Sequence, residues 1–208
     1  MKTRIFLCAA AVFLGLGQGL LAQTQPGTVL WICTPPDPIS VVCPAVAPDG
    51  TIYAAGAGFN GAPEALYAIS PHGAIKWIFT NDVSGSLVVG SPAIGSDGTI
   101  YFGDRSTNFF ALNPDGTVKW RYGLPVPHCS SSPAIGVDGT LYFVAAGYLY
   151  ALDSTGQARW QHLVDYSPSE YDQFSPVIEA DGTIYIPTGN GVHPKSWCLK
   201  GGFDNGWA

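Results

Sequence analysis

The sequence predicts an all-β protein assembled from a four-stranded antiparallel unit that is repeated about four times. Three observations favour this fold. One sequence phrase recurs at a spacing of 41 to 48 residues, beginning at Cys43, Ser91, Ser132 and Ser175. The 26 Gly and 17 Pro, with a single Met, suit many turns and few long helices. Residues that favour strands, such as Val, Ile, Tyr and Trp, are plentiful.

The first half of each unit is predicted to be a β-hairpin, as the copy beginning at Ser91 illustrates. Residues 91–95 form an apolar strand opened by Pro92, and residues 99–103 form the second strand. Asp97-Gly98 supplies the tight turn, because Gly adopts a positive φ freely and Asp tolerates one. Pro fits the first strand position, where a missing N–H costs least. The same residues recur in the other copies as Pro44, Pro133 and Pro176 and as Asp49-Gly50, Asp138-Gly139 and Asp181-Gly182.

The second half of the unit is predicted to be another hairpin. Residues 108–113 form the third strand, Pro114-Asp115-Gly116 turns the chain, and residues 117–122 form the fourth strand. Related phrases end at Trp77 and Trp160, as this one ends at Trp120. A large ring at a constant place in every unit serves packing between sheets, so we expect these Trp residues to be core residues.

The strands carry apolar residues on both faces, as at 100–102 and 108–112, so each sheet is expected to be covered on both sides. A β-propeller explains this pattern, because each blade lies between its neighbours. We therefore predict a β-propeller built from four-stranded antiparallel blades, of which about four are present. The expected boundaries are 44–79, 92–122, 133–163 and 176–208, with a strand at 28–33 that completes a preceding blade or the last one.

Three explanations of the blade count stay open. The chain is part of a longer propeller with further blades, or it closes as a four-bladed ring, or two copies pair as a homodimer of half-rings. Of these, the longer propeller agrees best with the usual blade number.

The N-terminus is typical of an export signal. Lys2 and Arg4 precede an apolar run from Ile5 to Leu16, and small residues continue to Ala22. The apolar run is too short for a membrane-spanning helix. We expect residues 1–22 to be a signal peptide, so that the mature chain is periplasmic or extracellular and is not inserted in a membrane.

Charge and cysteine content exclude several function classes. The chain has 15 acidic against 9 basic residues, a net charge of −6, and contains no basic cluster, so nucleic acid is a poor partner. Beyond the signal, four cysteines are expected to be buried or to form up to two disulfides, because none has zinc-site spacing. They are Cys33, Cys43, Cys129 and Cys198.

The second phrase carries a resemblance to a known family. Residues 151–160, ALDSTGQARW, resemble the Ala-x-Asp-x-x-Thr-Gly-x-x-x-Trp signature of the pyrroloquinoline-quinone (PQQ) repeat, with one spacer residue fewer. Residues 68–77 and 111–120 are looser versions, and the resemblance covers roughly residues 28 to 188. It implies a β-propeller, and it implies two kinds of relative. Quinoprotein dehydrogenases hold PQQ and Ca²⁺ at the propeller axis, whereas BamB-like members act as scaffolds without a cofactor.

No residue of the dehydrogenase site can be carried over. The adjacent cysteine pair of those enzymes is missing, and Asp104 and the acids near residue 170 lack ligand spacing. Ser130–Ser132 follow His128 and Cys129, but Ser132 holds the repeat position of Ser91, which favours a structural loop over a nucleophile. We therefore expect neither a catalytic nor a metal-binding residue.

The sequence favours a non-catalytic, exported binding or scaffold module for a protein, peptide or glycan. Binding residues are most often found in variable loops on a rigid frame. The least repeat-like segment supplies the candidate binding loop, formed by Asp165, Tyr166, Glu170, Tyr171 and Asp172. No cofactor is expected. The alternative is part of a PQQ- and calcium-dependent dehydrogenase that oxidises alcohols or sugars.

Overall fold

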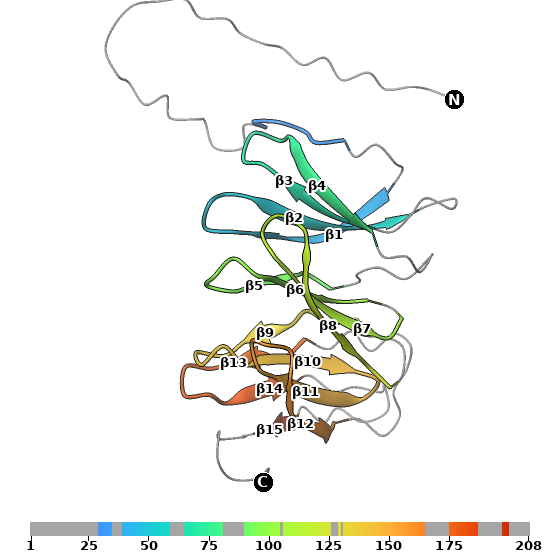
Figure 1. The fold of residues 1–208 in the computed structure, drawn as a ribbon. Helices are drawn as coiled ribbons and strands as arrows, with labels where there is room; N and C mark the ends of the chain where they lie inside the picture. The colour runs from blue at the N-terminus through green and yellow to red at the C-terminus, as the bar shows by residue number, and fades with distance from the viewer. Residues whose placement is uncertain are drawn as a thin grey trace, which may run out of the picture. The chain divides into compact units, whose positions relative to one another are not determined.

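The computed structural model describes residues 29–34, 39–58, 65–80, 90–104, 106–125, 129, 131–164, 175–186 and 197–199. The chain divides into two compact units, Met1–Leu30 and Trp31–Ala208, and the strands belong to the second unit (Figure 1). No helix in the described ranges is long and apolar enough to cross a membrane.

The described strands form four antiparallel sheets, in each of which the strands are adjacent in chain order. This confirms the expected all-β fold and the meander within each unit. The first sheet contains β1 (Ile39–Val46), β2 (Ile52–Gly58), β3 (Ala65–Ile69) and β4 (Ile75–Thr80). The second contains β5 (Ala93–Ile94), β6 (Ile100–Gly103), β7 (Asn108–Leu112) and β8 (Val118–Gly123). The third contains β9 (Ala134–Ile135), β10 (Leu141–Ala145), β11 (Tyr148–Leu152) and β12 (Ala158–Leu163). The fourth contains β13 (Val177–Ile178), β14 (Ile184–Ile186) and β15 (Trp197–Leu199).

The Asp-Gly turns form as the sequence predicts. In the second sheet, Oδ1 of Asp97 accepts a hydrogen bond from the Thr99 backbone N–H at 3.0 Å, and Oδ2 accepts one from the Thr99 hydroxyl at 2.8 Å. Gly98 between them has a φ of 81°, which a residue with a Cβ adopts only with strain. The same Asp-to-Thr bonding recurs at Asp49 and Asp138, so local chemistry determines where each hairpin turns.

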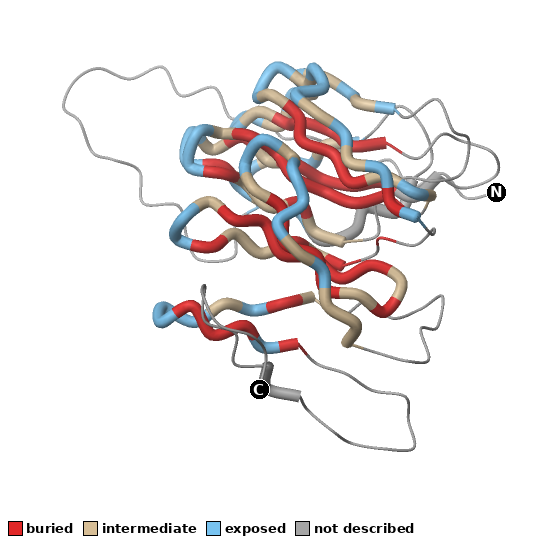
Figure 2. Tube along the Cα trace, turned by 60° about the horizontal axis from the view of Figure 1, so that its bottom comes forward, coloured by how far each residue is buried: buried red, intermediate tan, exposed pale blue. Residues whose placement is uncertain are grey.

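The core lies between consecutive sheets, as Figure 2 shows by the buried colour along the middle strands. β6 and β10 are buried along their whole length, which confirms that the sheets are covered on both faces. The rings of Phe109 and Phe143 stack across the second and third sheets with their centroids 3.9 Å apart. Three apolar clusters join the first sheet to the second, the second to the third, and the third to the fourth.

The repeated Trp residues are packing residues, as predicted. Within the second sheet, Tyr101, Ala111 and Trp120 are aligned on neighbouring strands, and the small Ala lets the two rings lie 5.8 Å apart. Trp120 also reaches the third sheet, where its Nε1 donates to the Ser154 carbonyl at 3.0 Å. Its ring covers Gly156, where an added Cβ would lie 2.7 Å from the ring. Gly156 is thus required for two reasons: its positive φ disfavours a residue with a Cβ, and the Trp120 ring leaves no room for one.

Two boundary predictions need correction. β1 begins at Ile39, so Pro44 lies inside the strand and not at its start. The register of β1 against β2 shifts between Val42 and Ala45, and such a bulge accommodates the missing N–H of Pro44. The expected strand at 28–33 is also wrong for the described residues 29–34, which form no strand. The described hydrogen bond of this segment comes from a side chain, Nε1 of Trp31, and not from strand pairing.

The prediction that the cysteines are buried or bridged is confirmed for Cys129, which is buried. Cys33 and Cys129 are free thiols, so at most one of the two possible disulfides remains. Cys129 is fully buried against Gly103, and burial, with the nearby Asp104 carboxylate, raises the pKa of its thiol. A protonated, buried thiol is unreactive. Cys129 therefore acts as a small apolar core residue.

Candidate functional site

The strands of each sheet are connected at their two opposite ends, which form two edges of the stack of sheets. In an antiparallel meander, the turns from the first to the second strand and from the third to the fourth lie at one edge, which we call the turn edge. The connections from the second to the third strand, and from the fourth strand to the next sheet, lie at the other, which we call the loop edge. In Figure 1 the turns between the first two strands of each sheet lie at the left.

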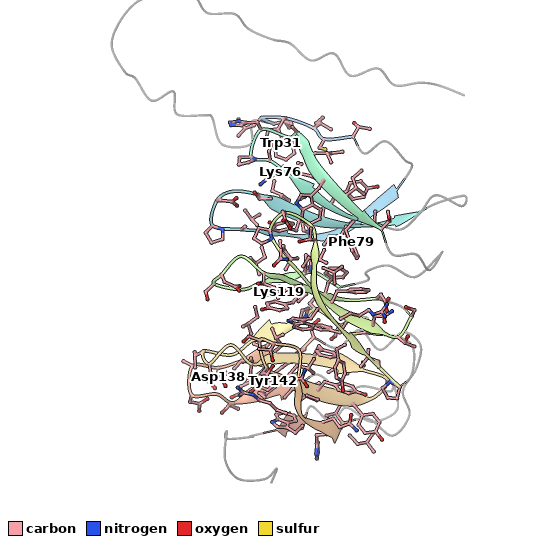
Figure 3. All side chains as sticks on the ribbon, in the orientation of Figure 1. Trp31, Lys76, Phe79, Lys119, Asp138 and Tyr142 are labelled. Atoms are coloured by element: carbon pink, nitrogen blue, oxygen red, sulfur yellow. The ribbon has the colours of Figure 1, made fainter. Side chains whose placement is uncertain are left out.

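The turn edge is nearly the same in the first three sheets. Asp97 in the first turn pairs with Lys119 on β8, with Nζ and Oδ2 2.9 Å apart, and Asp138 pairs with Arg159 at 2.8 Å (Figure 3). Lys76 lies 4.0 Å from Asp49 and donates to the Thr51 hydroxyl at 3.1 Å. Each of these pairs joins two residues of the same sheet. The basic residue before each Trp was a signal for this pairing that the sequence analysis missed.

The loop edge differs from sheet to sheet. In the third sheet, β10 and β11 are joined by a tight turn at Ala146 and Gly147, which have φ of 47° and 79°. In the second sheet, the corresponding connection is held by Asp104. Its fully buried carboxylate accepts hydrogen bonds from the Ser106 hydroxyl at 2.6 Å and from the Asn108 backbone at 2.7 Å. Asp104 therefore shapes a turn from a buried position.

A row of serines joins the sheets at the loop edge. The Ser91 backbone N–H donates to the Ser132 hydroxyl at 2.8 Å, and the Ser132 N–H donates to the Ser175 hydroxyl at 2.9 Å. The neighbouring Ser131 is buried and accepts a hydrogen bond from the Val144 N–H at 2.8 Å. Ser131 and Ser132 are therefore structural, in agreement with the sequence analysis. The repeat position of Ser132 predicted a structural residue, whereas its hydrogen bonds between sheets were not predicted from the sequence.

The candidate binding loop of Asp165, Tyr166, Glu170, Tyr171 and Asp172 lies outside the described residues, but the residues on both sides of it are described. On its N-terminal side, the Val164 N–H donates to the Gly147 carbonyl at 2.8 Å. On its C-terminal side, Ser175 accepts the hydrogen bond from Ser132. Val164 and Ser175, which flank the segment 165–174, are thus each hydrogen-bonded to the third sheet at the loop edge.

Among the described residues, titratable groups are not gathered into a metal-binding cluster. In the part of the chain that the structure describes, no group of three or more His, Cys, Asp and Glu residues could hold a metal ion. His72 lies in the exposed turn of the first sheet, whereas His128 and His193 lie outside the described residues. The Asp104 carboxylate, which already accepts three hydrogen bonds, is engaged in its own turn.

Comparison with known proteins gives one family and several structural neighbours. The family described as "Outer membrane protein assembly factor BamB" matches residues 17–196. The protein "Uncharacterized protein YxaL" of Bacillus subtilis (strain 168) is 39% identical over 66 residues, which cover 31% of this chain and 16% of YxaL. The crystal structure of BamB from Moraxella catarrhalis superposes with a TM-score of 0.52 at 20% identity, over 68% of this chain and 44% of that protein.

Two further solved structures share the fold. The C-terminal WD40 domain of Sif2 has a TM-score of 0.56 at 15% identity, over 76% of this chain and 43% of that one. A protein of unknown function from Bacteroides caccae has a TM-score of 0.52 at 16% identity, over 78% and 61% of the two chains. At these identities the likeness concerns the fold alone. The chain spans less than two thirds of the length of each of these proteins.

Proposed function

Because the chain belongs to the family of the outer membrane protein assembly factor BamB, and is a β-propeller built from PQQ-like repeats, we propose that it is an exported, non-catalytic scaffold. It binds a segment of another protein through the loop edge. The sequence of residues 1–22 supports export, because two basic residues precede a short apolar run and small residues.

The observation that carries this proposal is the anchoring of segment 165–174. The hydrogen bonds at Val164 and Ser175 hold the two residues that flank the segment on the third sheet, whose strand β10 is buried. A variable segment held in this way is the usual arrangement of a binding loop on a scaffold. By contrast, the turn edge repeats one arrangement in three sheets and uses its charges internally.

The composition of the segment indicates the chemistry of the partner. It contains three carboxylates, Asp165, Glu170 and Asp172, and the two rings of Tyr166 and Tyr171. Tyr supplies a large contact area with a polar tip, and acidic groups favour a basic surface. The proposed partner is therefore a basic protein segment with exposed apolar side chains.

A peptide-array experiment tests this proposal. The purified chain is applied to peptides that vary independently in Lys/Arg content and in aromatic content, and binding is quantified by fluorescence. We expect the strongest binding to basic peptides that carry aromatic or aliphatic residues. Replacing Tyr166 and Tyr171 by Ala, and Asp165, Glu170 and Asp172 by their amides, should reduce this binding at least about tenfold, which is 1.4 kcal/mol.

A matched control uses acids of the turn edge. Asp115→Asn combined with Asp153→Asn removes two exposed carboxylates from that edge and should leave peptide binding unchanged. If the loop and turn-edge variants lose binding equally, the effect is one of net charge and the proposed site is wrong. Preferential binding to glycans on a parallel array would show that the partner is a glycan and not a protein.

The absence of a cofactor is part of the proposal and has its own test. The chain is titrated with PQQ in the presence of Ca²⁺, while quinone absorbance and dye-linked oxidation of alcohols and sugars are followed. We expect neither a saturable absorbance change nor turnover. Saturable binding with turnover would instead establish the alternative, part of a quinoprotein dehydrogenase.

A further inference from the structure

The Asp-Gly pairs of the turn edge carry the atoms of a backbone rearrangement. The backbone nitrogen that follows an Asp can attack the Asp side-chain carbonyl, and Gly favours this step because it has no side chain to crowd its nitrogen. In each pair the Gly N–H also donates to a carbonyl of its own turn at 2.9 Å, so this bond does not distinguish one pair from another. The surroundings of the carboxyl group therefore decide which pair reacts. The pairs are Asp49-Gly50, Asp97-Gly98, Asp115-Gly116, Asp138-Gly139 and Asp181-Gly182.

The carboxyl groups in the first turns of the first three sheets are held on both oxygens. Asp49, Asp97 and Asp138 each accept one hydrogen bond on Oδ1 and another on Oδ2 from the Thr two residues later. Asp97 also pairs with Lys119 at 2.9 Å, and Arg159 pairs with Asp138 at 2.8 Å. Donors and cations favour the ionised form of a carboxyl group, in which neither oxygen leaves readily as water.

Asp115, in the second turn of the second sheet, is held on one oxygen only. It is exposed, and its hydrogen bonds from the Thr117 N–H at 3.0 Å and the Thr117 hydroxyl at 2.6 Å both end on Oδ1. Among the residues that the structure describes, no Lys, Arg or His pairs with this carboxylate. The Thr117 hydroxyl is the largest cause of a lowered pKa of Asp115, and no cation contributes, whereas the bond from Lys119 is the largest cause that brings the pKa of Asp97 to about 2. Asp115 therefore reaches the neutral, reactive form more readily than Asp97.

We propose that Asp115 rearranges to isoaspartate in the folded chain several times faster than Asp97 or Asp138. The Gly116 nitrogen forms a bond to Cγ of Asp115, and the amide proton and the carboxyl OH leave together as water, which gives a succinimide. Water then opens the ring. Cleavage between the nitrogen and Cγ restores Asp-Gly, whereas cleavage between the nitrogen and the main-chain carbonyl carbon leaves the main chain running through Cβ and Cγ. One water is lost and one is gained, so no other reagent is needed, and the inference does not rest on the proposed function.

The rearrangement changes a contact that joins the first and second sheets. Nε1 of Trp77 donates to the Pro114 carbonyl at 2.9 Å, and its ring lies 2.8 Å from the position of a Cβ added to Gly116. Isoaspartate at position 115 adds one main-chain atom between these two contact points, so Trp77 cannot keep both contacts in their present geometry. The first sheet should therefore pack less tightly on the second after the rearrangement.

Peptide mapping tests the proposal on the full folded chain, which is aged in water enriched in heavy oxygen and then digested in ordinary water. Trypsin releases residues 106–119 as one peptide in which Asp115 is the only acid, whereas Asp97 and Asp138 lie in other peptides. Each passage through the succinimide adds a heavy oxygen, and electron-transfer fragmentation distinguishes isoaspartate from Asp. Both signals at Asp115 should exceed those at Asp97 and Asp138 several times. Equal signals at the three positions, or none at Asp115, overturn the proposal.

The unfolded chain and a Lys119 variant are the controls for the role of the fold. In urea the hydrogen bonds and ion pairs are lost, so Asp97, Asp115 and Asp138 should react at similar rates. In the folded chain, Lys119→Gln should raise the rate at Asp97 and leave the rate at Asp115 unchanged. If Asp115 leads by the same factor in urea, its sequence neighbours and not the fold are the cause, and the proposal is wrong.

Asp115→Glu tests the effect on the joint between the sheets. The variant keeps the carboxylate, but the larger ring that a Glu would form closes far more slowly. The urea midpoint of the aged wild type should fall as isoaspartate accumulates, whereas the aged variant should keep its midpoint. An unchanged midpoint in a wild-type sample that contains isoaspartate at position 115 overturns the predicted loss of the Trp77 contacts.

Discussion

At the residue scale, the chain uses one polar arrangement repeatedly. An Asp in the first turn accepts hydrogen bonds from the Thr two residues later and pairs with the basic residue before the Trp. For Asp97, the hydrogen bond from Lys119 is the largest cause, and the Thr99 backbone the next, of a lowered carboxyl pKa. The side chains of Asp97 and Lys119 are 56% and 36% exposed, so solvent screens the pair and its contribution to stability is small.

The pH dependence of stability tests this arrangement. The pKa of Asp97 falls from 3.8 to about 2 in the folded chain, so its contribution is complete above pH 3.8 and is lost as the pH falls through about 2. Asp97→Asn should lower the free energy of unfolding at neutral pH by less than about 1 kcal/mol and should flatten its decline in this acid window. Urea denaturation at a series of pH values measures both.

Lys119→Gln is the companion variant, because it removes the ion pair and leaves the Thr99 bonds to Asp97. The decrease in its free energy of unfolding at acid pH should lie between those of the wild type and Asp97→Asn. If the free energy of unfolding falls identically with acid in all three proteins, the hydrogen bond from Lys119 is not the cause of the lowered pKa of Asp97.

At the element scale, each sheet depends on a small residue in its third strand. Ala68, Ala111 and Ala151 are fully buried and lie in register between the Tyr of the second strand and the Trp of the fourth. The two rings meet over this Ala at centroid distances of 5.7 to 5.8 Å. In the fourth sheet, Cys198 lies opposite Tyr185 at the same position in the register.

Enlarging this position should separate the rings. Ala111→Val inserts two methyl groups where Tyr101 and Trp120 meet, and overpacking of this kind costs about 1–3 kcal/mol. Chemical denaturation monitored by Trp fluorescence should report the loss. Ala158→Val in β12 is the control, because Ala158 is exposed and a β-branched residue suits a strand. An equal loss in both variants would show that crowding between the rings is not the reason.

At the scale of the whole molecule, the sheets are held together by apolar clusters and by the Trp side chains that reach from one sheet to the next. Trp77 and Trp120 each donate to a carbonyl and cover a glycine in the following sheet. The serine row adds backbone-to-hydroxyl bonds at the loop edge. Each contact joins residues 34 to 43 positions apart, so the stack is maintained by contacts between consecutive units.

Two glycine variants separate the contribution of a Trp contact between sheets from the contribution of backbone strain. Gly156 and Gly139 have similar φ values, 85° and 79°, but an added Cβ would meet Trp120 only at Gly156, and nothing lies within 4 Å at Gly139. Gly139→Ala should cost about 1–2 kcal/mol from the left-handed backbone alone. Gly156→Ala should cost clearly more and should shift Trp120 fluorescence, which chemical denaturation and emission spectra measure. Equal losses would mean that the Trp contact contributes nothing to stability.

The sequence by itself determined the repeated unit, its four strands and its turns, because these depend on residues close together in the chain. Asp97-Gly98-Thr99 forms its turn through bonds that span two residues, and such chemistry is readable without a structure. The sequence also identified Trp120 as a packing residue and Ser132 as a structural one.

The tertiary structure alone decided which residues meet across the repeats. The pairing of Ser132 with Ser175, the docking of Trp31 on Gly73 and the burial of Asp104 each depend on where separate strands lie in space. The burial of a face is likewise a property of its neighbour: Tyr101 is buried and Tyr185 is exposed, although the same phrase surrounds them both. No local pattern encodes that difference, because it comes from the sheet that covers one residue and leaves the other at the surface.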